Sequence, residues 1–218
     1  MKDAVKPKRT YRSTRRAEQV AEKRRTILEA ADARFRADGY GAVTMPEIAR
    51  EAGVAVETIY RAFGSKAGLF TAVIDAAVAG GAARAERPVE ERPAIRALIE
   101  EPDPRRQVEL YAATQPGIHR RSGQLLRALA SAAGTDPDLR ALWDTIERGR
   151  LTGQGRFVQM LADRSALRPG LSVEDGRDGL WTLTSLAVYD MLVVTRGWSP
   201  ERYERWLSDV LGGLLLPV

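Results

Sequence analysis

The chain has 218 residues, 44% of them hydrophobic, which is enough to bury the core of one large domain or two smaller ones. It contains no cysteine, so a disulfide framework and a thiolate metal site are both excluded. The N-terminus lacks an apolar core segment, and no later stretch approaches the roughly 20 apolar residues of a membrane span. We therefore expect a cytoplasmic protein that is neither secreted nor inserted in a membrane.

Positive charge is concentrated at the N-terminus. The net charge is +5, but residues 1–25 carry ten Lys or Arg and three acidic residues, so the remainder is net negative. Clustered cations attract dense phosphate at long range, which indicates a polyanionic partner. The same composition is typical of a solvated tail without a partner, and this alternative stays open here. Residues 1–20 are almost free of apolar side chains, which predicts a flexible basic arm.

Two helices are predicted directly after this arm. The first spans about residues 21–38 and ends at Gly39, with apolar side chains at helical spacing: Ile27, Leu28, Ala31 and Phe35. The second begins at Thr44, which has capping-box spacing to Glu47, and ends at about Ala52. Gly53 follows, the residue best suited to the left-handed conformation of a sharp turn.

A short third helix is predicted at about residues 55–62, with Ile59 on its apolar side together with Phe63. Gly64 closes it, and Ser65 is the N-cap of a fourth helix whose wide apolar stripe runs from Leu69 to Val78. Two short helices joined by a tight glycine turn are typical of a helix-turn-helix.

The rest of the chain is predicted to be helical, because prolines interrupt helical patterns and no alternating strand pattern occurs. The expected helices are about residues 91–100, 104–115, 118–133, 137–163, 173–196 and 200–215. The predicted fold class is all-α. Its expected domains are the arm (1–20), a helix-turn-helix domain (21–68) and a larger helical domain (69–218).

Residues 25–70 resemble the N-terminal domain of the TetR family of transcriptional regulators. The resemblance is carried by the following positions: Ile27-Leu28, Ala30-Ala31, Phe35, Gly39-Tyr40, Thr44, Ile48-Ala49, Ala52-Gly53-Val54, Thr58-Ile59-Tyr60, Phe63, Ser65-Lys66 and Leu69. It implies a three-helix DNA-binding domain followed by a larger domain for ligand binding and dimerisation. Many family members carry Ser at the position of Ala55 and Gly at that of Glu57, so the operator is expected to differ from the common ones.

The resemblance places four residues on DNA phosphates: Thr44, Thr58, Tyr60 and Lys66. Physical chemistry supports two of them. Thr44 precedes free N–H groups at a helix start, and Lys66 opposes the dipole of the fourth helix, a cost that a phosphate would offset. Base contacts fall to Val56, Glu57 and Arg61, because these side chains suit a thymine methyl, a cytosine amine and a guanine respectively. Within the basic arm, we expect Arg12, Arg15 and Arg16 to contact DNA. A plain N-cap at Thr44 and a half-buried aromatic at Tyr60 remain alternatives.

Residues 179–213 resemble the C-terminal helix pair that forms the dimer in many relatives. Two apolar stripes mark the expected homodimer interface: Leu180, Leu183, Ala187, Met191 and Val194 in the first helix, and Tyr203, Leu207, Val210 and Leu214 in the second. Packing inside one chain is the alternative. The reading helices of a dimer would match a pseudo-palindromic operator in double-stranded DNA.

By resemblance, an effector pocket is expected among the middle helices. The candidates are the large or amphipathic side chains of that region: Tyr111, His119, Trp143, Phe157, Met160 and Trp181. Plain core packing is the alternative for each of them. His119 is the only histidine, so a multi-histidine metal site is excluded, and we expect no cofactor and no metal.

Other functional classes find little support in the sequence. There is no GxSxG motif, no Walker loop and no cysteine nucleophile, so we expect no enzyme. The prediction is a repressor released by a small apolar effector of unknown identity. An activator that no ligand relieves, or a helical protein-interaction module, is the alternative.

Overall fold

The computed structural model describes the backbone of residues 9–217 and the side chains of residues 18–217. It contains helices and connecting turns, with no β-strand in residues 9–217, which confirms the predicted all-α class. The chain divides into two compact units, the first ending at Val73 and the second beginning at Ile74. The division falls inside one helix, slightly beyond the predicted boundary at residue 68.

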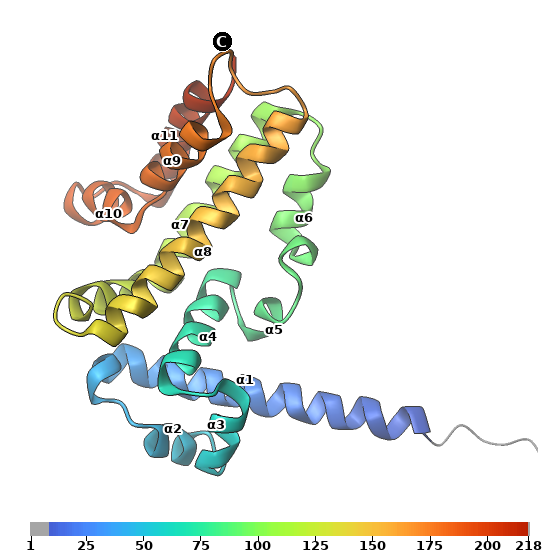
Figure 1. Cartoon of the computed structure of the whole chain (residues 1–218), viewed down its shortest axis with the longest axis vertical. Helices are drawn as coiled ribbons and strands as arrows, with labels where there is room; N and C mark the ends of the chain where they lie inside the picture. Colours follow the sequence, from blue (N-terminus) through green and yellow to red (C-terminus); the bar gives the residue numbers. More distant parts are fainter. Residues whose placement is uncertain (1–8, 218) are drawn as a thin grey trace, which may run out of the picture. The chain divides into compact units, whose positions relative to one another are not determined.

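The first unit contains the helices α1 (Arg9–Ala42), α2 (Met45–Glu51) and α3 (Val56–Phe63) and the start of α4 (Lys66–Ala79), in blue to turquoise in Figure 1. Within α1, Gly39 has a φ of 76°, so the regular helix stops there, as its sequence predicts. The core of the unit is apolar, and its most deeply buried side chains are Ile27, Phe35, Ile48, Ile59, Leu69 and Phe70.

The N-terminal part of α1 differs from the sequence prediction. Residues 9–20 were expected to belong to a flexible arm, but α1 begins at Arg9 and includes them. Lys, Arg, Glu and Ala have high helix propensity, and extending an existing helix requires no new nucleation. Only residues 1–8 of the predicted arm lie outside the described residues.

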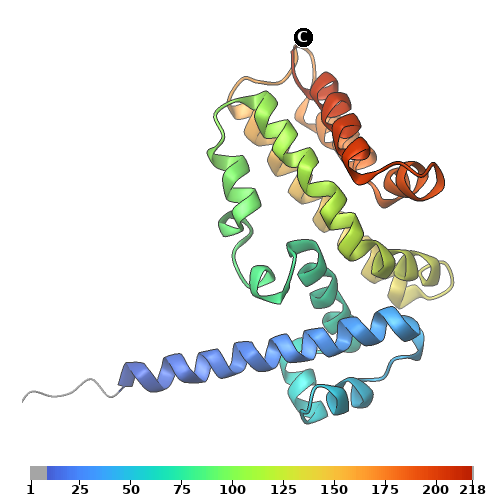
Figure 2. The same cartoon turned by 180° about the vertical axis from the view of Figure 1, so that it is seen from behind.

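The second unit contains the remaining helices. These are α5 (Ala82–Ala85), the short turn η1 (Val89–Glu91), α6 (Pro93–Glu100), α7 (Pro104–Ala132), α8 (Pro137–Asp163), α9 (Val173–Leu183), α10 (Leu186–Tyr189), η2 (Asp190–Thr195) and α11 (Pro200–Leu215). The long helices α7 and α8 lie side by side, α11 packs on α7, and α9 packs on α8 and α11 (Figures 1 and 2). Asp103, Asp136 and Ser199 cap the helices that follow them.

One expected helix boundary is wrong. Pro116 was expected to separate two helices, but α7 runs through it without a break. Proline removes one N–H donor from a helix, so the carbonyl of Ala112 receives no bond from residue 116. The segments on both sides of Pro116 are buried at Val108, Ala112 and Leu125, and this packing outweighs the cost of about 3 kcal/mol.

A second boundary is also wrong. The single helix expected over residues 173–196 is interrupted at Thr184 and Ser185, and Ser185 caps α10 by accepting a hydrogen bond from the Val188 N–H. The helix then widens into η2, a π-helical segment. The direction in which side chains point therefore changes twice within this stretch.

The core of the second unit is built mainly from α7, α8, α9 and α11. Its apolar centre includes Val108, Val158, Leu161, Leu180 and Leu207, each at most 1% exposed. No single helix of the described residues is long and apolar enough to cross a membrane. The pair α3 and α4 passes that test together, but it is bent by 69° at the break between the two helices.

Candidate DNA interface and effector core

The turn between α2 and α3 has the geometry expected of a helix-turn-helix. Gly53 adopts a φ of 64°, and the N–H of Val54 donates to the carbonyl of Ala49 at 3.0 Å. The next helix, α3, begins after Ala55, whose side chain makes no capping hydrogen bond because alanine has no polar group. The sharp turn places α3 as a short, separate helix immediately after α2.

One face of α3 is buried and the other is exposed. Ile59 is 0% exposed, whereas Tyr60 is 49% exposed, and Glu57 and Arg61 are exposed as well. Val56 and Thr58 are half-buried. The amphipathic pattern predicted for this helix is therefore present, and the five side chains proposed to meet DNA lie wholly or partly on its outer side.

The start of α2 is held by the predicted capping box. The N–H and the hydroxyl of Thr44 both donate to Glu47 Oε2, at 2.9 and 2.6 Å. These bonds stabilise the charged carboxylate and lower the pKa of Glu47. The Thr44 hydroxyl is thereby occupied within its own helix start, while the residue remains exposed.

Lys66 lies close to the same part of the first unit. Its Nζ donates to the carbonyl of Gly41 at 3.4 Å and sits 4.5 Å from the ring centroid of Tyr40, a cation–π contact. Partial burial lowers the pKa of Lys66, and the nearby Glu47 carboxylate opposes that effect. The fold thus brings Thr44 and Lys66, which are far apart in sequence, to one patch beside the α1–α2 connection.

Arg24 is a residue whose role the sequence does not indicate. Its guanidinium donates to the carbonyl of Ala62 at 3.3 Å and lies 4.3 Å from the ring centroid of Phe63. A cation at the C-terminal end of a helix meets the negative end of the helix dipole. Arg24 on α1 therefore fixes the end of α3. Three arginines of the predicted arm were expected to contact DNA, and their side chains lie outside the described residues: Arg12, Arg15 and Arg16.

A polar stripe follows the buried side of α7. Gln107, Gln115, His119 and Ser122 are all at most 7% exposed, and Tyr111 lies on the same face. Their spacing of four, four, four and three residues is that of one helix face. This signal was present in the sequence, but the expected break at Pro116 divided it between two helices.

His119 lies against aromatic rings from two other elements, α10 and α11. It stacks on Tyr189 with ring centroids 4.5 Å apart, and Tyr203 meets both rings edge-on, at 6.3 Å from His119 and 5.1 Å from Tyr189. Burial lowers the pKa of His119 to about 4, with the Arg150 charge acting in the same direction. His119 is therefore neutral at physiological pH.

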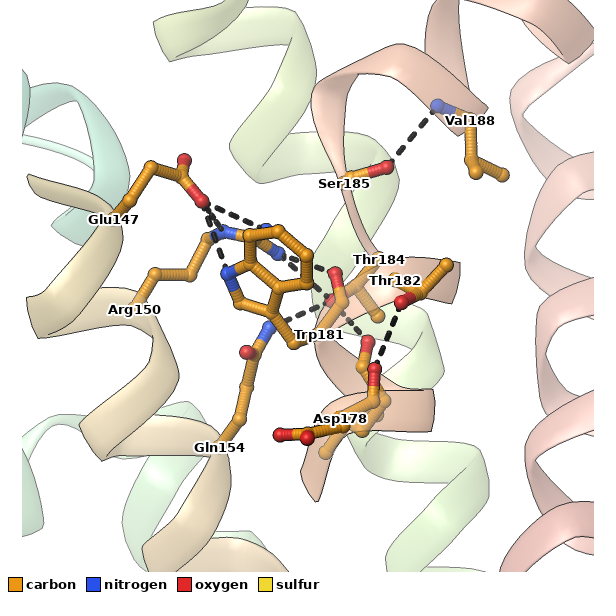
Figure 3. A network of polar contacts seen from close by, with 10 residues as sticks. Glu147, Arg150, Gln154, Asp178, Trp181, Thr182, Thr184, Ser185 and Val188 are labelled. Atoms are coloured by element: carbon orange, nitrogen blue, oxygen red, sulfur yellow. Dashed lines mark hydrogen bonds and ion pairs between the residues drawn. The ribbon is translucent and has the colours of Figure 1, made fainter. Parts of the chain in front are cut away.

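A polar network surrounds the interruption between α9 and α10 (Figure 3). Arg150 donates to the carbonyl of Trp181 at 2.8 Å and pairs with Glu147 at 3.0 Å, and the indole N–H of Trp181 donates to the same carboxylate. Gln154 donates to the Thr184 hydroxyl at 2.7 Å, and that hydroxyl donates to the carbonyl of Leu180. The Trp181 carbonyl at the interruption thus receives its hydrogen bond from a side chain on α8.

The six predicted pocket residues are only partly brought together. Tyr111 stacks on Phe157 at 4.6 Å, Met160 packs on the same core, and His119 lies in the ring cluster of that core. Trp181 belongs to the Arg150 network, whereas Trp143 is half-buried near the start of α8, outside that core. A groove of about 590 Å³ runs along the surface of α8, and Met160 is the one predicted residue that lines it.

The expected dimer stripe is not one surface. Leu180, Tyr203 and Leu207 are 0% exposed and form part of the core of their own unit, so their assignment to an interface is corrected. The interruption at Thr184 and the π-helical η2 rotate the later side chains away from the face of Leu180. Among the other predicted positions, Met191 and Val194 are 56% and 64% exposed. Ala187 is also exposed, and three more are half-buried: Leu183, Val210 and Leu214.

Arg121 holds the C-terminal end of α4. Its Nε donates to the carbonyl of Ala77 at 2.8 Å and its Nη2 to that of Val78 at 3.1 Å. The helix closes with Gly80, whose φ is 84°, and with a bond from the Gly81 N–H to the carbonyl of Ala76. No sequence signal distinguishes this arginine from its exposed neighbour Arg120.

Comparison with known proteins supports the fold and the DNA-binding segment. The family model described as bacterial regulatory proteins, tetR family, matches residues 27–73. The structure of NalD, the secondary repressor of the MexAB-OprM multidrug efflux pump in Pseudomonas aeruginosa, is similar with a TM-score of 0.65 and 21% identity, over 90% of this chain and 98% of that one. A search of curated proteins finds no match.

Two further solved structures share the fold. A protein from Saccharomonospora viridis in complex with choline has a TM-score of 0.63 and 20% identity, over 90% of this chain and 99% of that one. The fatty acid degradation regulator FadR from Bacillus halodurans has a TM-score of 0.65 and 15% identity, over 88% and 95%. Both likenesses extend across the two units.

Proposed function

We propose that the chain is a ligand-released repressor, a DNA-binding transcriptional regulator and not an enzyme, because residues 27–73 match the family model of bacterial regulatory proteins, tetR family. It acts in the cytoplasm as a homodimer on a pseudo-palindromic operator, and a small, largely apolar effector releases it. The observation that carries the proposal is the exposed face of α3, presented directly after the Gly53 turn.

The side chains of this face suit direct reading of bases in a major groove, which admits one helix. Arg61 is assigned to a guanine, Glu57 to a cytosine amine and Val56 to a thymine methyl. Thr58 and Tyr60 are assigned to the adjacent phosphates. Because α3 offers one cation and one anion, specificity comes from this helix, while the N-terminal cations Arg12, Arg15 and Arg16 supply much of the affinity.

Thr44 and Lys66 supply a second set of phosphate contacts. Free N–H groups at the start of α2 favour an anion beside Thr44. The Lys66 ammonium makes a single hydrogen bond with the described residues, a long one of 3.4 Å to the carbonyl of Gly41. Its cation–π contact with Tyr40 holds it at the same patch. A DNA phosphate would replace the weak carbonyl contact by a charge-assisted bond.

The homodimer is assigned to the C-terminal helices on their exposed positions. Ala187, Met191 and Val194 are exposed on α10 and η2, and the half-buried Val210 and Leu214 of α11 are assigned to the interface as well. A twofold interface uses the same patch on both copies and sets the distance between the two α3 helices.

Release by an effector requires that the ligand prefer the DNA-incompetent state. We assign the transmission to α4, which starts in the first unit and ends in the second. Its last turn is bound by Arg121, only two residues after His119 on α7. The choline complex of one structural neighbour and the drug-pump and fatty acid roles of two others fit a small-molecule effector.

The test is selection of DNA from a random pool, followed by binding at increasing salt. We expect an enriched sequence with twofold symmetry, and a log affinity that falls by about 0.9 for each phosphate neutralised. Enrichment of no sequence, or retention on DNA that does not depend on salt, would refute operator binding. An enriched site without symmetry would refute the homodimer, and the position of the site relative to a promoter separates a repressor from an activator.

A further inference from the structure

Five polar side chains in the second unit have buried atoms that make no hydrogen bond with the described residues. Two of them are Arg92 and Gln107, and the other three lie on α7, α8 and α11. These three are Gln154 through Oε1, His119 through both ring nitrogens, and Tyr203 through its hydroxyl. These side chains are 4%, 6% and 0% exposed. A buried polar atom without a partner is destabilising, so a core that keeps several of them together is less stable than one in which each is paired.

The orientation of Gln154 follows from its neighbours. The Thr184 hydroxyl donates its only proton to the carbonyl of Leu180 at 2.7 Å, so it accepts from Gln154 and cannot donate to it. The amide nitrogen of Gln154 must therefore face Thr184, and Oε1 makes no hydrogen bond with the described residues. The hydroxyl of Tyr111 lies beside the same two residues.

The three side chains belong to one cluster. Thr184 lies against Gln154 on one side, and its backbone approaches His119 on the other, although neither histidine nitrogen reaches hydrogen-bond geometry. The ring centroid of Tyr203 lies 6.3 Å from that of His119, and the ring of Tyr189 contacts both, at 4.5 Å from His119 and 5.1 Å from Tyr203. The cluster therefore combines unpaired donors and acceptors with aromatic walls.

Two of the arginines that act on this cluster are already paired. Arg150 is bound by Glu147 at 3.0 Å, and Arg127 by Asp190 at 2.7 Å. Arg120 is a further exposed cation that acts on Tyr189. No carboxylate of the described residues faces the cluster without an arginine partner, so an organic cation finds no anion there. An organic anion would have to displace Glu147 from Arg150.

We propose that the cluster of His119, Gln154 and Tyr203 is the effector site and binds an uncharged alcohol or phenol. The ligand hydroxyl donates to Gln154 Oε1 and accepts from the Tyr203 hydroxyl, while neutral His119 serves a second polar group of the ligand. The apolar part of the ligand packs on the rings of Tyr189 and Tyr203. This inference rests on the proposed function, and it changes the expected effector from purely apolar to a molecule with at least one hydroxyl group.

The test uses the full-length protein and phenol as the probe. His119 is the only histidine, so its two ring C–H protons give one pair of histidine NMR signals, and these report on the site. Three matched compounds are titrated in parallel: fluorobenzene, which has no donor, benzoate, an anion, and choline, a cation. We expect saturable phenol binding with a shift of the His119 signals, and at least about tenfold weaker binding of the other three.

Two substitutions examine the polar groups themselves. Tyr203→Phe removes only the unpaired hydroxyl, so it should weaken phenol binding about five- to tenfold and raise the Tm by about 2–4 °C. Gln154→Met should also weaken phenol binding. Gln159→Met is its matched control, because Gln159 is exposed on the same helix and bonds only to Asp163, so phenol binding should not change.

The inference is overturned if phenol produces no shift of the His119 signals, or if fluorobenzene, benzoate or choline binds as tightly. It is equally overturned if Tyr203→Phe lowers the Tm and leaves phenol affinity unchanged, because the hydroxyl would then serve the fold. Operator binding is measured on the same samples. Loss of operator binding in the unliganded protein speaks against the proposed function, whereas intact operator binding without a phenol site speaks against this inference alone.

Discussion

Replacement of Arg121 by methionine tests whether this residue holds the end of α4. The guanidinium makes two bonds to carbonyls of the last turn, at 2.8 and 3.1 Å. The Ala77 carbonyl also accepts the N–H of Gly80, so Arg121 adds to a turn that is already closed by glycines. Arg121→Met keeps most of the apolar stem and removes both bonds.

The magnitude follows from these contacts. Hydrogen bonds to charged groups contribute about 1.5–3 kcal/mol each when buried, and Arg121 is partly exposed, so we take about 2 kcal/mol for the pair. This lowers the Tm of the protein by about 4–8 °C. Amide exchange in the last turn of α4 should accelerate as well, because its carbonyls lose their anchor.

Arg120→Met is the matched control. Arg120 is exposed and precedes Arg121 on the same helix, so its loss should shift the Tm by less than about 2 °C. Thermal unfolding of both variants, combined with hydrogen exchange over residues 74–81, decides the matter. The reasoning is refuted if Arg121→Met unfolds at the same temperature as Arg120→Met with unchanged exchange in α4.

Three further predictions concern single residues. Burial lowers the pKa of His119 from 6.5 to about 4, so the unfolded chain binds more protons than the folded protein between these pH values. The free energy of unfolding should therefore fall as the pH falls from 6.5 to about 4, by about 3 kcal/mol in all. Denaturant titrations of His119→Phe should lack this loss. Lys66→Met should weaken operator binding and reduce the slope of log affinity against log salt by about 0.9, and an unchanged slope would remove Lys66 from the phosphate contacts. Gly53→Ala should destabilise the first unit by about 1–2 kcal/mol in urea unfolding, because the φ of 64° strains any side chain although a Cβ meets no atom within 4 Å; a change below 0.5 kcal/mol in the same assay, about the effect of a neutral surface substitution, would contradict this.

The first unit was largely predictable because its signals are local. The capping box of Thr44 and Glu47, the left-handed Gly53 and the apolar spacing around Ile59 each act within one turn of chain, and each is present in the structure. The contacts that tie these helices together were not predictable. The bonds of Arg24 to α3 and of Lys66 to Gly41 join residues far apart in sequence, where no local pattern applies.

The second unit shows the opposite balance. Its helical class follows from the sequence, but Pro116 does not end α7 and Thr184 does interrupt an apolar helical pattern. In both places tertiary packing outweighs local propensity, since a buried helix tolerates one missing N–H and the partly buried Arg150 donates to the Trp181 carbonyl at the interruption.

The sequence by itself determined the helical class, the helix-turn-helix and the outward face of α3, because these depend on periodicity and on single turn residues. Only the tertiary structure decided which apolar stripe is core and which is surface. Leu180, Tyr203 and Leu207 repeat at the same helical spacing as the exposed Met191 and Val194, and only packing against α7 and α8 removes them from water. The same packing gathers His119, Gln154 and Tyr203 into one polar cluster, because burial and hydrogen bonding depend on neighbours that are distant in the chain.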